Sequence, residues 1–420
     1  MILRGAHLLH LDPPRVERAD LRIHGSEIVE VGQDLSGPDL RDVSDRLVMP
    51  GLVCGHTHLY SALACGMPAL PGAPRDFPDM LARVWWRLDE ALDAESIQVS
   101  GLVGGLAALR AGVTTVVDHH ASPNHIEGSL ELLDGSLDQV GLRRILAYEV
   151  TDRGGSERAL AGLGAHEGLM ARQDDHRAVM IGAHANFTLS EDTLARCGAM
   201  AREAGVGLHI HLAEAIDDQR RVGEDLVTRM ERLGALAPGS LMAHGVHLDS
   251  TQIRRLTEAG CWLAHQPRSN MNNGVGHAPI QRFGTDTLLG TDGIGADMFA
   301  ELQAGFFRAN EAGTGWSPAR WLQALGSGAR FASSTLGVTL GRLEAGAQAD
   351  LVLLRPPCGP PITDNNLASS FVFQLSAALV DEVMVAGRTR LRAGEASGLS
   401  SAALGERASA ASRALWDRMR

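Results

Sequence analysis

Histidines and carboxylates recur in short motifs along this sequence, and their spacing suits a metal site. His56 and His58 stand two residues apart in GHTHLY, a spacing that points both side chains to the same face of a strand. Such a pair can offer two imidazole ligands to one metal ion. The same residue types recur in LHIHLAE with His209, His211 and Glu214, in MAHGVH with His244 and His247, and in GTDG with Asp292. Each motif is a weak signal alone, but core packing does not readily explain their combination.

Short apolar runs supply the strands that would carry these side chains. From residue 51 onward, strand-length runs alternate with longer segments patterned as amphipathic helices. The predicted strands are Leu52–His56, Val113–Asp118, Arg144–Val150, Val179–His184, Val206–His211, Leu241–His244, Trp262–His265 and Leu288–Gly290. The predicted helices include Ile97–Ala111, Glu191–Ala204, Asp217–Leu233 and Ser250–Ala259. Eight strands alternating with helices predict an α/β fold, a (β/α)8 TIM barrel, whose active site sits at the carboxyl ends of its strands.

The two ends of the chain have a different pattern from the barrel region. Residues 1–50 and 340–392 both consist of short β-like runs with turns, such as DEVMVAGRTRLR. Because they flank the barrel, predicted over 51–339, we expect them to meet as one small composite β-sandwich. The tail over 393–420 is rich in Ala, Ser and Arg and predicts a terminal helix.

Composition narrows the classes of function. The chain has 420 residues, of which 45% are hydrophobic and 21% charged, as expected of a globular protein. Its net charge of −12 argues against nucleic acid or an anionic membrane as a partner. No run approaches the roughly 18 apolar residues of a membrane span, and the start of the chain shows no secretion signal. Five scattered cysteines, none in a CxxC pair, fit a cytoplasmic location.

The absence of lysine excludes several kinds of chemistry. All 38 basic residues are arginine. A Schiff base, a lysine-anchored pyridoxal cofactor and a Walker-type phosphate lysine are therefore excluded. So is a metal pair bridged by a carboxylated lysine.

Taken together, the motifs resemble the amidohydrolase superfamily, in its deaminase/chlorohydrolase branch, over nearly the full length. The matching segments are PGLVCGHTHLYSAL, RAGVTTVVDHH, LHIHLAE, LMAHGVHL, LAHQPRSN, GTDG and LGRLEAGAQADLVLL. Within that branch the chain is most similar to SsnA-type aminohydrolases, on the segments PGLVCGHTHLYSALACGMP, WWRLDEALD, VVDHHASP, AYEVTDRGG and GAHANFTLSEDTL.

The resemblance implies one divalent metal ion, Zn²⁺ or alternatively Fe²⁺. The positions that match the family's ligands are His56, His58, His211 and Asp292. Glu214 and His244 match its proton-transfer and substrate-carbonyl positions, and Asp292 is placed to accept the proton of a water molecule. The missing lysine independently favours a one-metal over a two-metal site. The family also implies a small heterocyclic substrate and a homodimer.

Further residues near strand ends are candidates for substrate binding. They are His120, His184, Arg153 and Gln266. His119 is the alternative to His120, and a surface salt bridge is the alternative for Arg153. Gln266 and Arg268 in HQPRSN depart from the family's usual HNP, and Cys65 stands where relatives often carry Arg. These departures leave the identity of the substrate open.

The predicted function is hydrolytic deamination of an aminated N-heterocycle such as a purine, pterin, pyrimidine or triazine. A metal-activated water would attack the amino-bearing ring carbon, and ammonia would leave. The alternative within enzymes is removal of chloride, or opening of a cyclic amide, by the same site. A non-catalytic barrel scaffold is the alternative from another class, and the complete ligand set disfavours it.

Overall fold

Parallel strands form the centre of the computed structural model, which describes residues 1–69 and 72–420. Nearly all of their residues are buried, as expected for strands covered on both faces. The strands are β6 (Leu52–Thr57), β7 (Val113–His120), β8 (Arg143–Tyr148), β9 (Arg177–Val179), β10 (Ile181–Ala185), β11 (Leu208–Leu212), β12 (Leu241–His244), β13 (Trp262–His265) and β14 (Thr287–Leu289).

These strands form two parallel sheets, in the orders β6-β7-β8-β9 and β10-β11-β12-β13-β14. Only Met180 separates β9 from β10, so the strand predicted over Val179–His184 is interrupted at that residue. Isolated parallel bridges pair Val150 with Ala183, and Thr57 with Asp292. The predicted parallel α/β architecture is confirmed.

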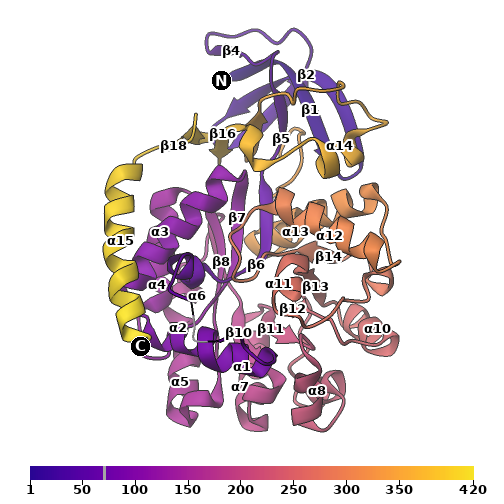
Figure 1. Ribbon diagram of the computed structural model, residues 1–420. Coiled ribbons are helices and arrows are strands. Elements are labelled where there is room, and N and C mark those ends of the chain that lie inside the picture. Colours follow the sequence, from indigo (N-terminus) through magenta and orange to yellow (C-terminus); the bar gives the residue numbers. More distant parts are fainter. Residues whose placement is uncertain (70–71) are drawn as a thin grey trace.

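Helices follow most of these strands and cover the outside of the sheets (Figure 1). They include α3 (Ala94–Arg110), α4 (Ser129–Val140), α5 (Ser156–Gly164), α7 (Glu191–Ala204), α10 (Ser250–Glu258), α12 (Met298–Glu311) and α13 (Pro318–Leu336). The helix expected over Asp217–Leu233 is two helices, α8 (Ile216–Val222) and α9 (Leu226–Arg232). Gly223, at φ 75°, ends α8, and the Asp225 side chain caps α9 by accepting from the Thr228 amide. A glycine at positive φ is a usual end of a helix.

The two ends of the chain share one nine-stranded sheet, in which β5 pairs with β15. Its own hydrophobic core includes Leu8, Leu21 and Leu351. That this sheet forms a sandwich stays a prediction. Its strands are β1 (Ile2–Leu11), β2 (Pro14–His24), β3 (Glu27–Gly32), β4 (Leu40–Asp42), β5 (Leu47–Pro50), β15 (Leu351–Leu354), β16 (Val380–Val385), β17 (Arg388–Arg392) and β18 (Glu395–Ala396).

The last helix and two short helices lie outside the parallel sheets. The last helix, α15 (Ser401–Arg418), runs down the side of the parallel sheets next to α3 (Figure 1). Short helices α1 (Phe77–Met80) and α2 (Trp86–Ala91) lie at the end away from the nine-stranded sheet (Figure 1). Among the described residues, no helix is both long and apolar enough to cross a membrane.

Candidate metal centre

The histidine and aspartate side chains of the site lie at, or just beyond, the ends of four parallel strands. His56 lies on β6 with His58 just beyond it, His211 lies on β11, and His244 ends β12. Asp292 follows β14. His244 and Asp292 both have positive φ, 74° and 53°, a conformation that is uncommon for residues other than glycine and that often marks functional sites.

Four side chains converge closely enough to hold one metal ion. The candidate ligand atoms of His56, His58, His211 and Asp292 all lie within 4.8 Å of one another, and all four residues are buried. Asp292 Oδ1 lies 2.9 Å from His58 Nε2 and 3.3 Å from His56 Nε2. The structure therefore brings together the four positions that the resemblance implied.

Hydrogen bonds to backbone carbonyls orient two of these imidazoles toward the centre. His58 Nδ1 donates to the carbonyl oxygen of His119 (2.6 Å), and His211 Nδ1 donates to that of His184 (2.9 Å). Because a carbonyl oxygen can only accept, both Nδ1 atoms carry a proton. The two Nε2 atoms nevertheless face each other at 3.1 Å, so a cation must separate them: a metal ion, or a proton in its absence.

His56 adds a second sign that a cation belongs at this point. Its Nδ1 lies 2.8 Å from His209 Nε2, so His209 supports the ring from behind. Its Nε2 is buried and has no hydrogen-bond partner among the described residues. Buried polar atoms are normally satisfied, and a metal ion would satisfy this one. Three imidazoles and a carboxylate form a donor set suited to Zn²⁺ with a position left open.

The electrostatics of the cluster keep its acid ionised. Burial opposes ionisation of Asp292, but its contacts with His56 and His58 outweigh burial and hold its pKa well below the usual range. Burial also opposes protonation of His58, yet the Asp292 carboxylate raises the pKa of His58 to about 9. The pKa of His56 is lowered to about 3, chiefly by burial. In the metal-free protein, a proton on His58 therefore occupies the place of the ion.

His119 contributes to a second grouping that overlaps the first. Its Nδ1 lies 3.3 Å from Glu149 Oε2, and its Nε2 donates to the carbonyl oxygen of His209. His58, His119, Glu149 and His211 also offer mutually close ligand atoms. The two groupings share His58 and His211, and His119 already faces a carboxylate of its own. The first set therefore fits one ion better.

Glu214 and His244 lie beside the centre in a separate environment. Glu214 Oε2 is 3.7 Å from His244 Nε2, and both groups cluster with Asp292. Burial raises the pKa of Glu214 to about 7, against the lowering effect of His244. Glu214 can thus exchange a proton near neutral pH, whereas Asp292 stays ionised.

One short helix, α11 (Pro267–Asn272), and the residue that follows it contact Asp292, His244 and Glu214. Ser269 Oγ donates to Asp292 Oδ2, and Asn270 Oδ1 accepts from His244 Nδ1 at 2.9 Å. Asn273, just after the helix, donates to Glu214 Oε1 at 3.4 Å. The backbone of His244 is also fixed, because its amide donates to Gln266 Oε1 at 2.9 Å.

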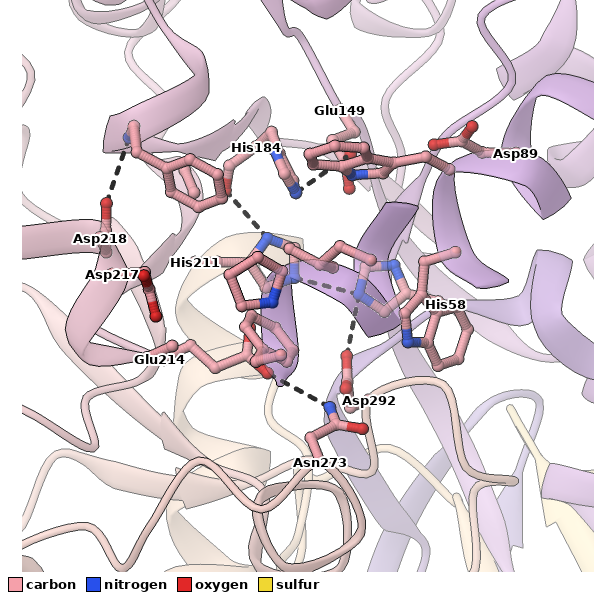
Figure 2. Close-up of a pocket in the computed structure, with 18 of the residues that line it drawn as sticks. His58, Asp89, Glu149, His184, His211, Glu214, Asp217, Asp218, Asn273 and Asp292 are labelled. Atoms are coloured by element: carbon pink, nitrogen blue, oxygen red, sulfur yellow. Dashed lines mark hydrogen bonds and ion pairs between the residues drawn. The ribbon is translucent and has the colours of Figure 1, made fainter. Parts of the chain in front are cut away.

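A pocket opens over the centre and is lined largely by aromatic and acidic side chains. Glu214 and Asn273 lie on one side of the His58–His211 pair, and Glu149, Asp89 and His184 lie on the other (Figure 2). The aromatic lining is Tyr60, Phe77, Trp85, Trp86 and Phe187. Such a wall suits a flat ring.

Of the four predicted substrate-binding residues, the structure brings only His184 to the pocket wall. His120 is fully buried and contacts Ser122 Oγ. Arg153 lies behind the wall on Asp89 and Glu149, and Gln266 is buried against the His244 backbone. At least one polar atom of each of these three side chains contacts a protein partner. His247 and His265 also lie outside the wall; His247 contacts the carbonyl oxygen of Val275.

Several residues of the site are not among those predicted from the sequence. Glu149 stands in the apolar run AYEV. An acid in such a run could have been recognised from the sequence as a candidate site residue. Ser269 and Asn270 stand in HQPRSN, where only Gln266 and Arg268 were considered. Asp89 and Asn273 gave no comparable signal, because only the fold brings them to the pocket.

Comparison with known proteins adds a match over most of the chain. A model of the Amidohydrolase family matches residues 47–390. A 5′-deoxyadenosine deaminase of Methanothermobacter thermautotrophicus is 29% identical over 410 residues, 92% of each chain. A 5-methylthioadenosine/S-adenosylhomocysteine deaminase of Natronomonas pharaonis is 31% identical over 384 residues, 86% of this chain and 85% of that protein.

Solved structures with the same fold are also similar over nearly the full length. An adenosine deaminase of Xanthomonas campestris with bound zinc aligns with a TM-score of 0.84 and 22% identity, over 100% of this chain and 98% of that one. The zinc complex of atrazine chlorohydrolase TrzN from Arthrobacter aurescens aligns with a TM-score of 0.82 and 21% identity, over 98% and 99%. At such identities the likeness shows the fold alone.

Proposed function

Because the chain belongs to the amidohydrolase family, we propose that it is a metal-dependent deaminase of an aminated N-heterocycle. The prediction of a hydrolase of this superfamily is confirmed by the family match. The observation that carries the proposal is the convergence of three buried imidazoles and one buried carboxylate beside a second, proton-exchanging carboxylate.

The proposed ligands of one Zn²⁺ ion are His56, His58, His211 and Asp292. The two facing Nε2 atoms and the unsatisfied Nε2 of His56 support this assignment. When bound, a zinc ion with an open position lowers the pKa of water to about 7 and so supplies a nucleophile at neutral pH.

The protein's own groups would handle the protons and orient the substrate. Asp292 is ionised and can accept the proton of the attacking water at its carboxylate. Glu214, with a pKa near neutrality, can protonate a ring nitrogen, take up the proton of the hydroxyl group formed at the ring carbon, and pass it to the departing amine. The proton held by Asp292, whose carboxylate lies within 4.8 Å of that of Glu214, then returns Glu214 to its protonated form. His244 Nε2, aimed toward Glu214, can contact the developing oxygen at the same ring carbon. Ammonia would leave as the carbonyl forms.

The substrate class follows from the lining and from the relatives. The aromatic wall supports a flat heterocycle, and both curated relatives described above are named as deaminases of adenosine derivatives. A chlorohydrolase shares the fold, so displacement of chloride from a ring is the second candidate. In either reaction the same groups would activate water and protonate the ring.

The remaining assignments are proposals of the same kind. We assign the closed (β/α)8 barrel to residues 51–339 and a composite β-sandwich to 1–50 with 340–392. The tail predicted over 393–420 begins with strand β18 of the nine-stranded sheet, and its helical part is α15. We also propose a cytoplasmic homodimer. Among the predicted contacts, His184 faces the substrate, Gln266 fixes His244, Arg153 supports the acidic wall, and His120 lies behind it.

Ammonia release and metal content, measured on one purified sample, test the proposal. The panel is adenosine, pterin, cytosine and melamine, with atrazine as the chlorinated probe. We expect about one zinc per chain and ammonia from at least one aminated ring. Chloride release without ammonia would favour the second candidate. A chain that binds no divalent metal and converts nothing would instead be a scaffold.

A further inference from the structure

Acidic side chains are a main feature of the pocket wall, and the described residues that line it include no arginine. The acidic side chains that line the pocket are Asp89, Glu149, Glu214, Asp217, Asp218 and Asp292. Within the described part of the chain, the only basic groups in this lining are histidines. Two of these acids already have roles at the metal centre, and Asp218 accepts from the amides of Phe187 and Ala213. Asp89, Glu149 and Asp217 remain without a role in the reaction, and of these Asp89 and Glu149 are the two buried ones.

Glu149 is a buried carboxylate whose histidine and arginine partners keep it ionised but lie farther away than a short charge-assisted hydrogen bond. It is 4% exposed and lies above the His58–His211 pair (Figure 2). Its oxygens are 3.3 Å from His119 Nδ1, 3.7 Å from His184 Nε2 and 3.4 Å from an Arg153 nitrogen. Charge-assisted hydrogen bonds are normally about 2.7–2.9 Å long. Glu149 therefore keeps the capacity to accept a hydrogen bond from a ligand.

Arg153, which lies next to Glu149, is already paired with acidic side chains of the pocket wall. Arg153 donates to Asp89 Oδ2 at 2.7 Å, and its guanidinium lies 4.9 Å from the Trp86 ring. One guanidinium thus serves two carboxylates. Asp89 Oδ1 is buried and has no hydrogen-bond partner among the described residues. One carboxylate oxygen beside Glu149 is therefore unsatisfied by the described protein groups.

We propose that the pocket selects heterocycles whose part facing Glu149 and Asp89 carries hydrogen-bond donors and no anionic group. This inference rests on the proposed function and specifies its substrate. Ring N–H, amino or hydroxyl groups would satisfy both acceptors. A phosphate or carboxylate there would face two carboxylates that already share the Arg153 guanidinium, and the described lining residues include no arginine to pair with the added anion.

Matched ligand pairs that differ only in the anionic group test this selection. The pairs are adenosine with adenosine monophosphate, and pterin with pterin-6-carboxylate, assayed for ammonia release by the zinc-loaded protein. The deaminated counterparts, inosine with inosine monophosphate and lumazine with lumazine-6-carboxylate, are measured by calorimetric titration. In at least one substrate pair we expect kcat/KM to be about 100-fold or more higher for the uncharged member. In at least one pair of deaminated ligands we expect the uncharged member to bind about 100-fold or more tightly, since like charges repel strongly in a buried site.

A charge-neutral variant separates electrostatics from shape. Glu149→Gln keeps the size of the side chain and one acceptor oxygen but removes the negative charge. The preference for the uncharged over the anionic ligand should therefore fall by about tenfold or more. The control is Glu157→Gln, an exposed position on α5, which should leave the preference unchanged. Zinc content and thermal unfolding establish that both variants fold.

The titrations distinguish failure of this inference from failure of the proposed function. Selective binding of uncharged ligands without ammonia release from any aminated ring would reject the deaminase and keep the inference. Equal affinity within each pair, preference for the anion, no binding of either member, or an undiminished preference in Glu149→Gln would overturn the inference.

Discussion

Two carboxylates a few ångströms apart have opposite titration behaviour in this site. Asp292 is paired with His56 and His58, which keep its pKa well below the usual range despite burial. Burial raises the pKa of Glu214 to about 7, because its partners there are weaker. Environments that push two pKa values apart commonly separate the roles of two acids. Here they leave Asp292 ionised and able to accept a proton, and Glu214 able to donate one near neutral pH.

Replacing Glu214 by Gln tests this division directly. Glu214→Gln should retain zinc but lower turnover by about 10²–10⁴-fold, since the amide cannot shuttle a proton. Steady-state kinetics with metal quantification would measure both. Glu258→Gln, an exposed acid at the end of α10, serves as the control. Near-normal turnover in Glu214→Gln would remove this residue from the mechanism.

Zinc affinity should depend on pH because a proton competes for the centre. The pKa of His58 in the metal-free protein is about 9, so below that pH the ion must displace a proton from His58. The apparent affinity should therefore fall by about tenfold per pH unit as pH is lowered from about 8 to about 6. Competition with a chelator at several pH values measures this. An affinity that is constant with pH would contradict the pairing of His58 with Asp292.

At the scale of elements, α11 links the metal centre to the proton-handling groups. Ser269, Asn270 and Asn273 contact Asp292, His244 and Glu214 respectively. Because these residues share one short segment, a shift of α11 would move all three contacts together. Catalytic groups generally need such support to hold their geometry.

Removing one α11 contact should lower kcat more than it changes KM. Asn273→Ala deletes the donor to Glu214, and a loss of roughly tenfold in kcat is expected from one hydrogen bond. Zinc content should not change. Asn365→Ala, at an exposed position, is the matched control. A rise in KM with kcat unchanged would show that Asn273 binds substrate instead.

Local sequence patterns predicted the elements better than the pocket. Apolar runs ending in histidine located the strands, because a buried parallel strand leaves a strong local pattern. The break at Gly223 within the expected helix was missed because amphipathic periodicity continues across it. The pocket wall was harder, since Asp89 and Arg153 meet only through the fold. The sequence therefore left two predictions open for Arg153, a contact with the substrate or a surface salt bridge.

At the scale of the whole molecule, a buried ion pair joins the parallel sheets to the nine-stranded sheet. Arg143 begins β8 and is fully buried, and it donates to Asp350 at 2.9 Å and to Gln348 at 2.8 Å. Asp350 also accepts from the Ala386 amide. One guanidinium thus ties the strand before Glu149 to segments more than 200 residues away.

Breaking this pair should destabilise the fold without altering the metal site. Arg143→Ala leaves the Asp350 carboxylate buried without its cation, which costs about 3–5 kcal/mol in the free energy of unfolding. Urea unfolding measures the loss, and zinc per folded chain should stay the same. Arg196→Ala, which removes an exposed pair with Asp192, should have little effect. Equal stability of the two variants would contradict the structural role of Arg143.

The proposal that one ion lies between His56, His58, His211 and Asp292 is tested most directly by anomalous diffraction at the zinc absorption edge from crystals of the zinc-loaded protein. We predict a single strong peak within bonding distance of all four side chains, at about 2.0–2.2 Å from their ligand atoms. A peak elsewhere, a peak that excludes one of the four, or two peaks in the pocket would contradict the account.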